Sequence, residues 1–270
     1  MADDLAWELI VVNNNSTDHT DAVIAEYRGR LPLRRELEPL QGHSNARNRA
    51  IVAARGEYIV WTDDDVIVGA RWLAAYAEAF RRWPDGVVFG GRIIPRYEPP
   101  VVKWIAQSER VLGGPFAIRD FGDEVQPLSV AESRIPYGAN FAVRTAEQRM
   151  VRYDPNLGLA PNRRRYDDEV DVITRLLAQW DQRILDTASN CGALHRPGAA
   201  NGRLHRGVQR RLGRNLRVSR CRHSGPIVAL VWHSEQDLAA TVCLGAAVSG
   251  LPLRVASALL GPILTSLLLQ

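Results

Sequence analysis

Short apolar runs alternate with segments of helical periodicity along most of the chain. We expect strands at Glu8–Val12, Leu33–Glu38, Glu57–Thr62, Val87–Ile94 and Tyr137–Val143. We expect helices at Thr20–Tyr27, at the apolar stripe Ala46, Ala50, Ile51 and Ala54, and at Ala70–Trp83 and Asp168–Trp180. Strands that alternate with helices favour an α/β fold in which helices flank a sheet with parallel strand pairs.

The composition changes near residue 190. From Thr187 to Ser234 there is no acidic residue, while arginines recur between Arg196 and Arg222. Leu238–Gln270 is almost wholly apolar, apart from interruptions such as Pro252. We therefore expect residues 1–190 to form the α/β domain and residues 191–270 to form an Arg-rich and then apolar appendage.

Composition and charge exclude several classes of protein. The 270 residues are 46% hydrophobic and 24% charged, with a net charge of +4, which is ordinary for a soluble globular chain. The three cysteines form no CxxC pair, so neither a zinc site nor a disulfide framework is expected. The expected compartment is a reducing cytosol. The N-terminus does not read as a secretory signal, and no P-loop, GxGxxG or GxSxG motif is present.

Three consecutive carboxylates follow the predicted strand Glu57–Thr62, in the sequence WTDDDV. Two like charges about 4 Å apart repel by about 1 kcal/mol in water and about 4 kcal/mol near a protein surface, so an opposing charge is expected. Carboxylates at the end of a strand suit a hard divalent cation such as Mg²⁺ or Mn²⁺. The alternative is that Asp65 caps a helix that begins near Val68, with Asp63 and Asp64 solvated.

Four segments, in this order, resemble the family-two glycosyltransferases of the GT-A fold: WELIVVNNNSTDHT, GHSNARNRAIVAARGEYIVWTDDDV, IPYGANFAVR and DDEVDVITRL. The resemblance covers about residues 5–197. It implies a GT-A-like, Rossmann-type mixed sheet, and sugar transfer from a nucleotide-diphospho-sugar, above all a UDP-sugar. It also implies a divalent metal cofactor, Mn²⁺ or Mg²⁺.

The resemblance assigns a metal site to the acidic triplet. Asp63 and Asp65 would correspond to the metal-binding pair of the DxD motif, and Asp64 would contact the donor sugar or ribose. His195 resembles a histidine that lies near the metal or the diphosphate in relatives, although a lone histidine is more often structural.

The same resemblance assigns nucleotide-sugar contacts to Asn13, Asn14, Arg47, Gly138 and Asn140. Asn13 stands where an aspartate is usual, so a charged acceptor is lost there. Arg47 would lie near the diphosphate, in the first turn of a helix, where a guanidinium and backbone N–H groups both favour phosphate. The alternatives are a solvated helix arginine at position 47 and plain strand packing at positions 138 and 140.

The acidic motif Asp168-Glu169-Val170-Asp171, followed by Arg175, would hold the general base. Counted back from Arg175, Glu169 aligns best with the base and Asp168 is the second choice. An inverting transfer needs such a carboxylate within hydrogen-bond reach of the acceptor hydroxyl. The alternative is that acids in the first turn of a helix only complement its dipole.

Relatives usually carry one more strand and helix before the WELIVV-type strand, and here only residues 1–6 precede it. A late start, a fragment and a divergent copy without full activity are all consistent with this. The loss would expose a strand edge or open a gap in the sheet.

The basic and apolar segment after residue 190 favours a peripheral position on an anionic membrane at its inner, cytoplasmic face. Its apolar halves are shorter than the roughly 20 residues of a spanning helix, and a soluble appendage or a frame-shifted tail remain alternatives. The arginines lack interleaved aromatics, so nucleic acid is not an expected partner.

The sequence therefore predicts a metal-dependent, inverting glycosyltransferase. Its expected partners are a nucleotide-sugar donor and a saccharide or lipid-linked acceptor in the synthesis of cell-envelope polysaccharide or glycolipid. The alternatives are a truncated, catalytically inactive homologue that acts as a binding or partner subunit, and a nucleotidyltransferase.

Overall fold

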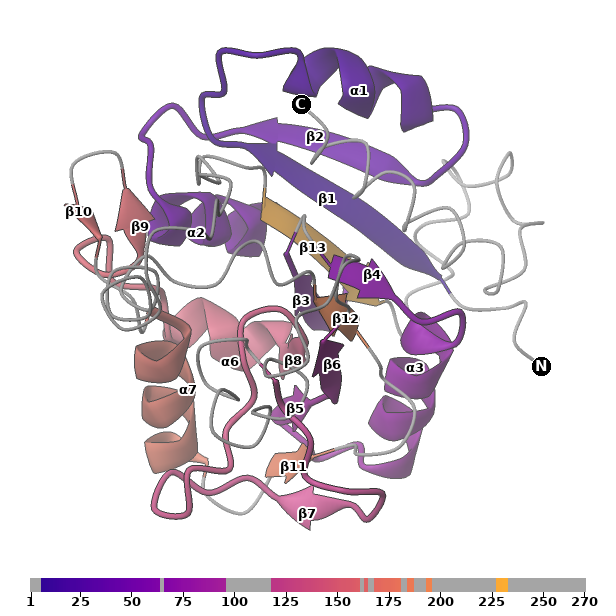
Figure 1. Ribbon diagram of the computed structural model, residues 1–270, viewed down its shortest axis with the longest axis vertical. Helices are drawn as coiled ribbons and strands as arrows, with labels where there is room; N and C mark the ends of the chain where they lie inside the picture. The colour runs from indigo at the N-terminus through magenta and orange to yellow at the C-terminus, as the bar shows by residue number, and fades with distance from the viewer. Residues whose placement is uncertain are drawn as a thin grey trace, which may run out of the picture.

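The computed structural model describes residues 6–63, 66–95, 118–160, 163–164, 168–180, 184–186, 193–195 and 227–232. Its main sheet has the strand order β2-β1-β13-β3-β8-β5-β11-β7 (Figure 1). These strands are β2 Leu33–Leu37, β1 Trp7–Asn13, β13 Ile227–Trp232, β3 Tyr58–Thr62, β8 Phe141–Arg144, β5 Val88–Gly90, β11 Ile184–Asp186 and β7 Gln126–Pro127.

Strand β13 lies in the interior of the main sheet, between β1 and β3. It is antiparallel to both, with Val12 opposite Ile227 on one side and Thr62 opposite Val228 on the other. The carboxyl ends of β1 and β3 therefore meet at the same edge of the sheet. The loss of a first strand was expected to expose a strand edge or open a gap in the sheet; in the structure β13, which comes from beyond the predicted boundary near residue 190, lies between β1 and β3.

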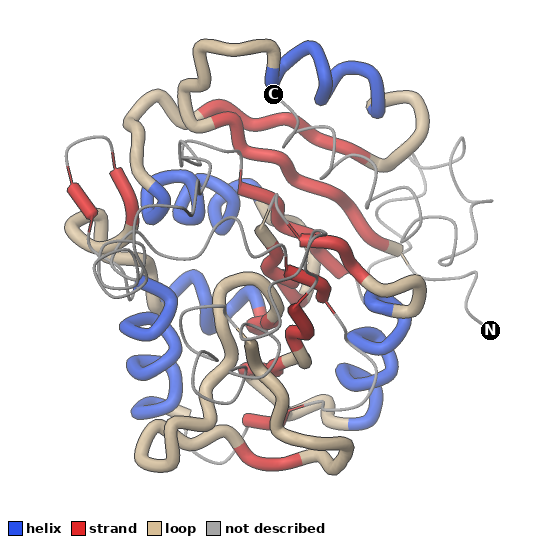
Figure 2. Tube along the Cα trace, in the orientation of Figure 1, coloured by secondary structure: helices blue, strands red, loops and turns tan. Residues whose placement is uncertain are grey.

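Helices cover both faces of this sheet, because alternate residues along each strand point to opposite faces (Figure 2). On one face, Leu9 and Val11 pack with α1 (Thr20–Tyr27) and α3 (Trp72–Arg82). On the other face, Ile10 and Val12 pack with α2 (His43–Ala53) and α7 (Asp168–Gln179). The short helix α6 (Thr145–Met150) follows β8 directly. The result is the layered α/β arrangement that the sequence predicts.

A second, three-stranded sheet has the order β4-β12-β6, with β4 Val66–Val68, β12 Ala193–His195 and β6 Ile93–Pro95. The predicted strand Val87–Ile94 is therefore two strands, β5 and β6, which belong to different sheets. The alternative in which Asp65 caps a helix near Val68 is wrong, because β4 follows the triplet and α3 begins only at Trp72. Among the described residues, β9 Leu159–Ala160 and β10 Arg163–Arg164 also pair as a two-stranded antiparallel sheet.

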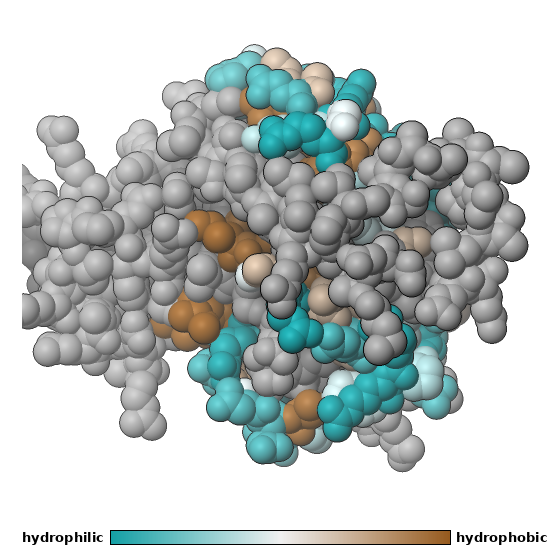
Figure 3. Space-filling view, turned by 90° about the vertical axis from the view of Figure 1, so that its right-hand side faces the viewer, coloured by the Kyte–Doolittle hydropathy of each residue, from teal (hydrophilic) through white to brown (hydrophobic). Residues whose placement is uncertain are grey.

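Other predictions for the C-terminal segment lie outside the described residues, among them the arginines Arg196–Arg222 and the tail Leu238–Gln270. No helix in the described part of the chain is long and apolar enough to cross a membrane. The face in Figure 3 carries hydrophilic side chains over much of its described surface, with hydrophobic ones between them. The exposed large hydrophobic residues come from separate segments, for example Leu40, Val52, Val130 and Met150.

Candidate active site

A hydrogen-bonded turn fixes the start of α2. Asn14, which follows β1, donates through Nδ2 to the carbonyls of Glu38 at 3.0 Å and Leu40 at 2.8 Å. Its Oδ1 accepts the backbone N–H of Gly42 at 2.6 Å. Gly42 has a φ of +146°, which residues with side chains rarely adopt. A glycine here therefore lets the chain turn into α2 directly after its contact with Asn14.

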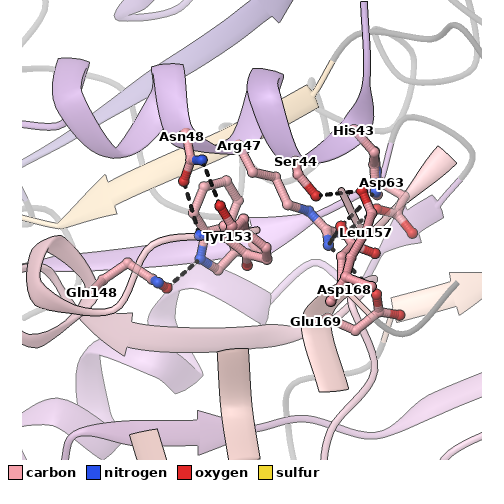
Figure 4. Close-up of polar contacts among 11 residues, drawn as sticks. His43, Ser44, Arg47, Asn48, Asp63, Gln148, Tyr153, Leu157, Asp168 and Glu169 are labelled. Carbon is pink, nitrogen blue, oxygen red and sulfur yellow. Dashed lines mark hydrogen bonds and ion pairs between the residues drawn. The ribbon is translucent and has the colours of Figure 1, made fainter. Parts of the chain in front are cut away.

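Arg47 lies one turn into α2, and its guanidinium reaches three carboxylates (Figure 4). Nη1 donates to Asp168 Oδ2 at 3.0 Å and lies 3.6 Å from Glu169 Oε2, while Nη2 lies 3.6 Å from Asp63 Oδ1. Burial alone would lower the pKa of Arg47, but the surrounding negative charges, led by Asp168, hold the pKa above its ordinary value. Arg47 is therefore a permanent positive charge between Asp63 and the acid pair of α7.

The adjacent carboxyls Asp168 and Glu169 differ in acidity, because their pKa values are shifted in opposite directions. Burial raises the pKa of Asp168, but the charge of Arg47 and the contact with His43 outweigh it, so this pKa lies well below its usual range. Burial and then the charge of Asp168 raise the pKa of Glu169 to about 8, against the opposing effect of Arg47. A hydrogen bond between the two carboxyls increases the difference. The pKa values of the two carboxyls are therefore pushed apart, with Asp168 the more acidic of the pair.

The ring of Tyr153 and the absence of a side chain at Gly138 allow the guanidinium of Arg47 to keep its position. The ring of Tyr153 lies 5.2 Å from Cζ of Arg47, and Asn48 ties the backbone of Tyr153 to α2 with hydrogen bonds of 2.8 Å and 3.0 Å. A Cβ atom at Gly138 would lie 2.6 Å from Nη2 of Arg47. Position 138 therefore borders the site and must be a glycine for Arg47 to keep this conformation.

Asp63 follows β3 at the sheet edge where the carboxyl ends of β1 and β3 meet, and 31% of its side chain is exposed. Asp64 and Asp65 lie outside the described residues. The backbone of His195, in β12, pairs with Val66, which places position 195 beside the residue that follows the triplet. Within the described residues, no group of three or more His, Cys, Asp or Glu residues could hold a metal ion.

Asn13 and Asn14 use their side chains inside the turn after β1. Asn13 donates to Asp21 Oδ1 at 2.8 Å and accepts the N–H of Ser16 at 2.8 Å. Both asparagines are nearly buried. Their side chains shape the loop at the carboxyl end of β1, where the resemblance expects the nucleotide base.

Asn140 lies in the core of the protein. Its Oδ1 accepts hydrogen bonds from Trp72 Nε1 and Tyr76 Oη, both at 2.8 Å, and its Nδ2 donates to the carbonyl of Arg92 at 2.9 Å. The side chain is fully buried. This geometry supports the strand-packing alternative for Asn140 and links β8 to α3.

No motif of the sequence singles out His43 or Tyr153. His43 Nδ1 lies 3.2 Å from Asp168 Oδ2, and Tyr153 supports Arg47 through its ring. The spacing of four residues between His43 and Arg47, which puts both on one helix face, was the available signal for His43. Tyr153 lies in a loop, and no motif marks it.

Two solved structures are similar to this one. The crystal structure of S. aureus TarS 1-349 in complex with UDP has a TM-score of 0.52 and 18% identity, and the match covers 70% of this chain and 51% of that one. Glucosyl-3-phosphoglycerate synthase from Mycobacterium tuberculosis in complex with Mn²⁺, UDP and glucosyl-3-phosphoglycerate has a TM-score of 0.44 and 18% identity, over 76% of this chain and 65% of that one. The protein thus has the GT-A glycosyltransferase fold, and it spans about half the length of the TarS chain.

The sequence profile of glycosyl transferase family 2 matches residues 2–142, just over half of the chain. The protein therefore belongs to glycosyl transferase family 2. A search of curated proteins finds no match.

Proposed function

We propose that the protein is an inverting glycosyltransferase that transfers a sugar from a UDP-sugar to a hydroxyl acceptor. The observation that carries this proposal is the position of Arg47, which contacts both Asp63 at the end of β3 and the acid pair at the start of α7. The residues proposed to serve the donor and those proposed to serve the acceptor are therefore within reach of one side chain.

Glu169 is the proposed general base, with Asp168 as the second candidate. About a quarter of the Glu169 side chain is exposed, whereas Asp168 is buried and already accepts contacts from Arg47 and His43. An acceptor hydroxyl can therefore approach Glu169 more easily. A carboxyl with a pKa raised toward neutrality is also the better proton acceptor once it is ionised.

In the proposed reaction, ionised Glu169 takes the proton of the acceptor hydroxyl as the oxygen attacks the anomeric carbon. The bond from that carbon to the diphosphate breaks, and the configuration inverts. Arg47 is proposed to lie near the diphosphate and Asp64 near the sugar or ribose. Asn13 and Asn14 are proposed to hold the loop against which the nucleotide binds, with Gly138 and Asn140 supporting the donor pocket from β8 and the residues before it.

Asp63, Asp65 and His195 are the proposed ligands of a divalent metal. The chemistry of Asp63 and its surroundings fits Mn²⁺ or Mg²⁺, since carboxylate oxygens suit hard cations and the buried hydroxyl of the neighbouring Thr62 has no hydrogen-bond partner in the described part of the chain. Asp63 and Asp168 together carry more charge than Arg47 neutralises, and the sequence adds Asp64 and Asp65. When bound, such an ion stabilises the diphosphate as a leaving group.

The acceptor is proposed to be a saccharide or a lipid-linked saccharide of the cell envelope, reached at the inner face of the membrane. The support for this setting is the basic and apolar sequence that follows His195. Arginine side chains attract anionic headgroups, and the adjoining apolar residues favour the interface.

The test of the proposed function is the metal dependence of donor use. We expect purified protein to hydrolyse a UDP-sugar, or to transfer its sugar, only with Mn²⁺ or Mg²⁺, and we expect Asp65→Ala to abolish both reactions. Release of UDP, measured with and without chelator, gives the readout. Full activity of Asp65→Ala without metal would contradict the mechanism, and UDP binding without any turnover would favour a catalytically silent homologue.

A further inference from the structure

His43 is a titratable residue of the site that the proposed mechanism leaves unused. It is the first residue of α2, and its Nδ1 lies 3.2 Å from Asp168 Oδ2. Arg47, four residues further along the helix, donates to the same oxygen at 3.0 Å. Residues i and i+4 lie on one helix face, so successive turns of α2 hold a single carboxylate oxygen.

Other groups pack closely around the carboxyl of Asp168. Gly158 faces the carboxyl so closely that a Cβ there would lie 3.1 Å from Oδ2. Ser44, next to His43, directs its hydroxyl to the carbonyl of Leu157 at 2.9 Å. In the described part of the chain, Asp168 forms ion-pair contacts with Arg47 and His43, and Arg47 also reaches Glu169 and Asp63.

Hydrogen bonds of the neighbouring turn position the backbone directly before His43. Asn14 accepts the N–H of Gly42, the residue directly before His43, and Asn14 is tied to two carbonyls of the β2–α2 loop. About a quarter of the His43 side chain is exposed, so the ring lies at the border between the buried pair and the solvent.

We propose that His43 is a positioning residue for the general base. Its Nδ1–H holds the carboxylate of Asp168, which stays ionised beside Glu169, so that the proton of the acceptor is taken by Glu169 and not by Asp168. This inference rests on the proposed function. It adds a residue that no motif of the sequence marks, and it gives the turn at Asn14 and Gly42 a function in arranging the base.

Two matched variants test which ring nitrogen matters. Asparagine places its amide nitrogen near the position of Nδ1, and glutamine places its own nearer to Nε2. We expect His43→Ala and His43→Gln to lower kcat about tenfold or more, as for a lost hydrogen bond to a charged group, with little change in the KM of the donor. We expect His43→Asn to retain most of the activity of the wild type. Rescue by His43→Gln instead, or an unchanged kcat in His43→Ala, would overturn the proposal.

A second measurement does not depend on turnover. The ¹⁵N resonances of His43, assigned by their absence from His43→Ala, report the state of Nδ1 in the intact protein. We expect Asp168→Asn to shift the Nδ1 resonance and Asp171→Asn, on the same helix, to leave it unchanged. An Nδ1 resonance that is equal in the wild type, Asp168→Asn and Asp171→Asn would also overturn the proposal. If no UDP-sugar is turned over by the wild type, the proposed function fails, whereas the NMR comparison still decides whether His43 holds Asp168.

Discussion

Arg47 illustrates how this protein accommodates a buried charge. Removing a guanidinium from water costs several kcal/mol unless its partners compensate, and Arg47 has Asp168 at 3.0 Å and the ring of Tyr153 at 5.2 Å. Nη1 and Nη2 of its rigid, planar guanidinium contact different carboxylates, a fixed spread of donors that the single ammonium nitrogen of a lysine does not offer. The side chain therefore links two acidic segments that are far apart in the sequence.

Glu169 is the residue whose replacement separates chemistry from binding. We expect Glu169→Gln to reduce transfer by about 10²-fold or more, because the amide cannot accept the acceptor's proton, while UDP-sugar binding persists. Transfer assays and calorimetric titration with the donor measure the two effects. Asp168→Asn is the matched comparison. If it abolishes transfer and Glu169→Gln stays fully active, the base is Asp168.

The sequence was most informative about residues that belong to local motifs. The order of the four segments indicated Arg47, Asp63, Asp168 and Glu169, and the structure brings these side chains together. It did not single out His43, whose one local signal is its spacing of four residues from Arg47 and whose contact with Asp168 is visible only in the structure. Nor could it decide between pocket and core for Asn140, because strand alternation does not say which face of a two-sided sheet carries the site.

At the scale of elements, β13 is the least predictable part of the fold. Local periodicity indicated β1, β3, α1 and α7 because each buries a face whose pattern can be read within one segment. The position of β13 depends instead on backbone pairing with two strands that precede it by more than 160 residues. Such long-range pairing leaves no periodic signal in the sequence.

A pair of truncations tests the role of β13. We expect a chain that ends at Trp232 to unfold cooperatively near the temperature of the full chain. We expect a chain that ends at residue 226 to lose cooperative unfolding or to aggregate, because β1 and β3 would each present an unpaired edge. Circular dichroism during heating and hydrogen exchange at Leu9–Val12 and Tyr58–Thr62 provide the measurements. Equal unfolding temperatures and equal protection in both truncations would show that β13 is dispensable.

For the whole molecule, the raised pKa of Glu169 links stability to pH. The folded state keeps this proton up to a pKa of about 8, whereas the unfolded chain loses it near 4.5. The folded state binds the proton more tightly, so this group makes stability fall as the pH rises from about 4.5 to about 8. We expect Glu169→Gln to remove that decline, so that the variant gains stability relative to the wild type toward pH 8.

Thermal unfolding of both proteins across pH 5 to 9 measures this difference. Asp171→Asn serves as the control, because Asp171 is a partly exposed carboxylate of the same helix that pairs with Arg175. A constant difference in unfolding temperature between wild type and Glu169→Gln at every pH would contradict the link.

The interior position of β13 also has a consequence for biosynthesis. A ribosome makes β1 and β3 first and adds roughly 5–20 residues per second, so the nascent chain waits on the order of ten seconds for the segment that joins them. During that interval β1 and β3 each lack their partner β13 and leave backbone edges open. We therefore expect productive synthesis to depend on something that shields those edges, a chaperone or the translating ribosome itself, until β13 emerges.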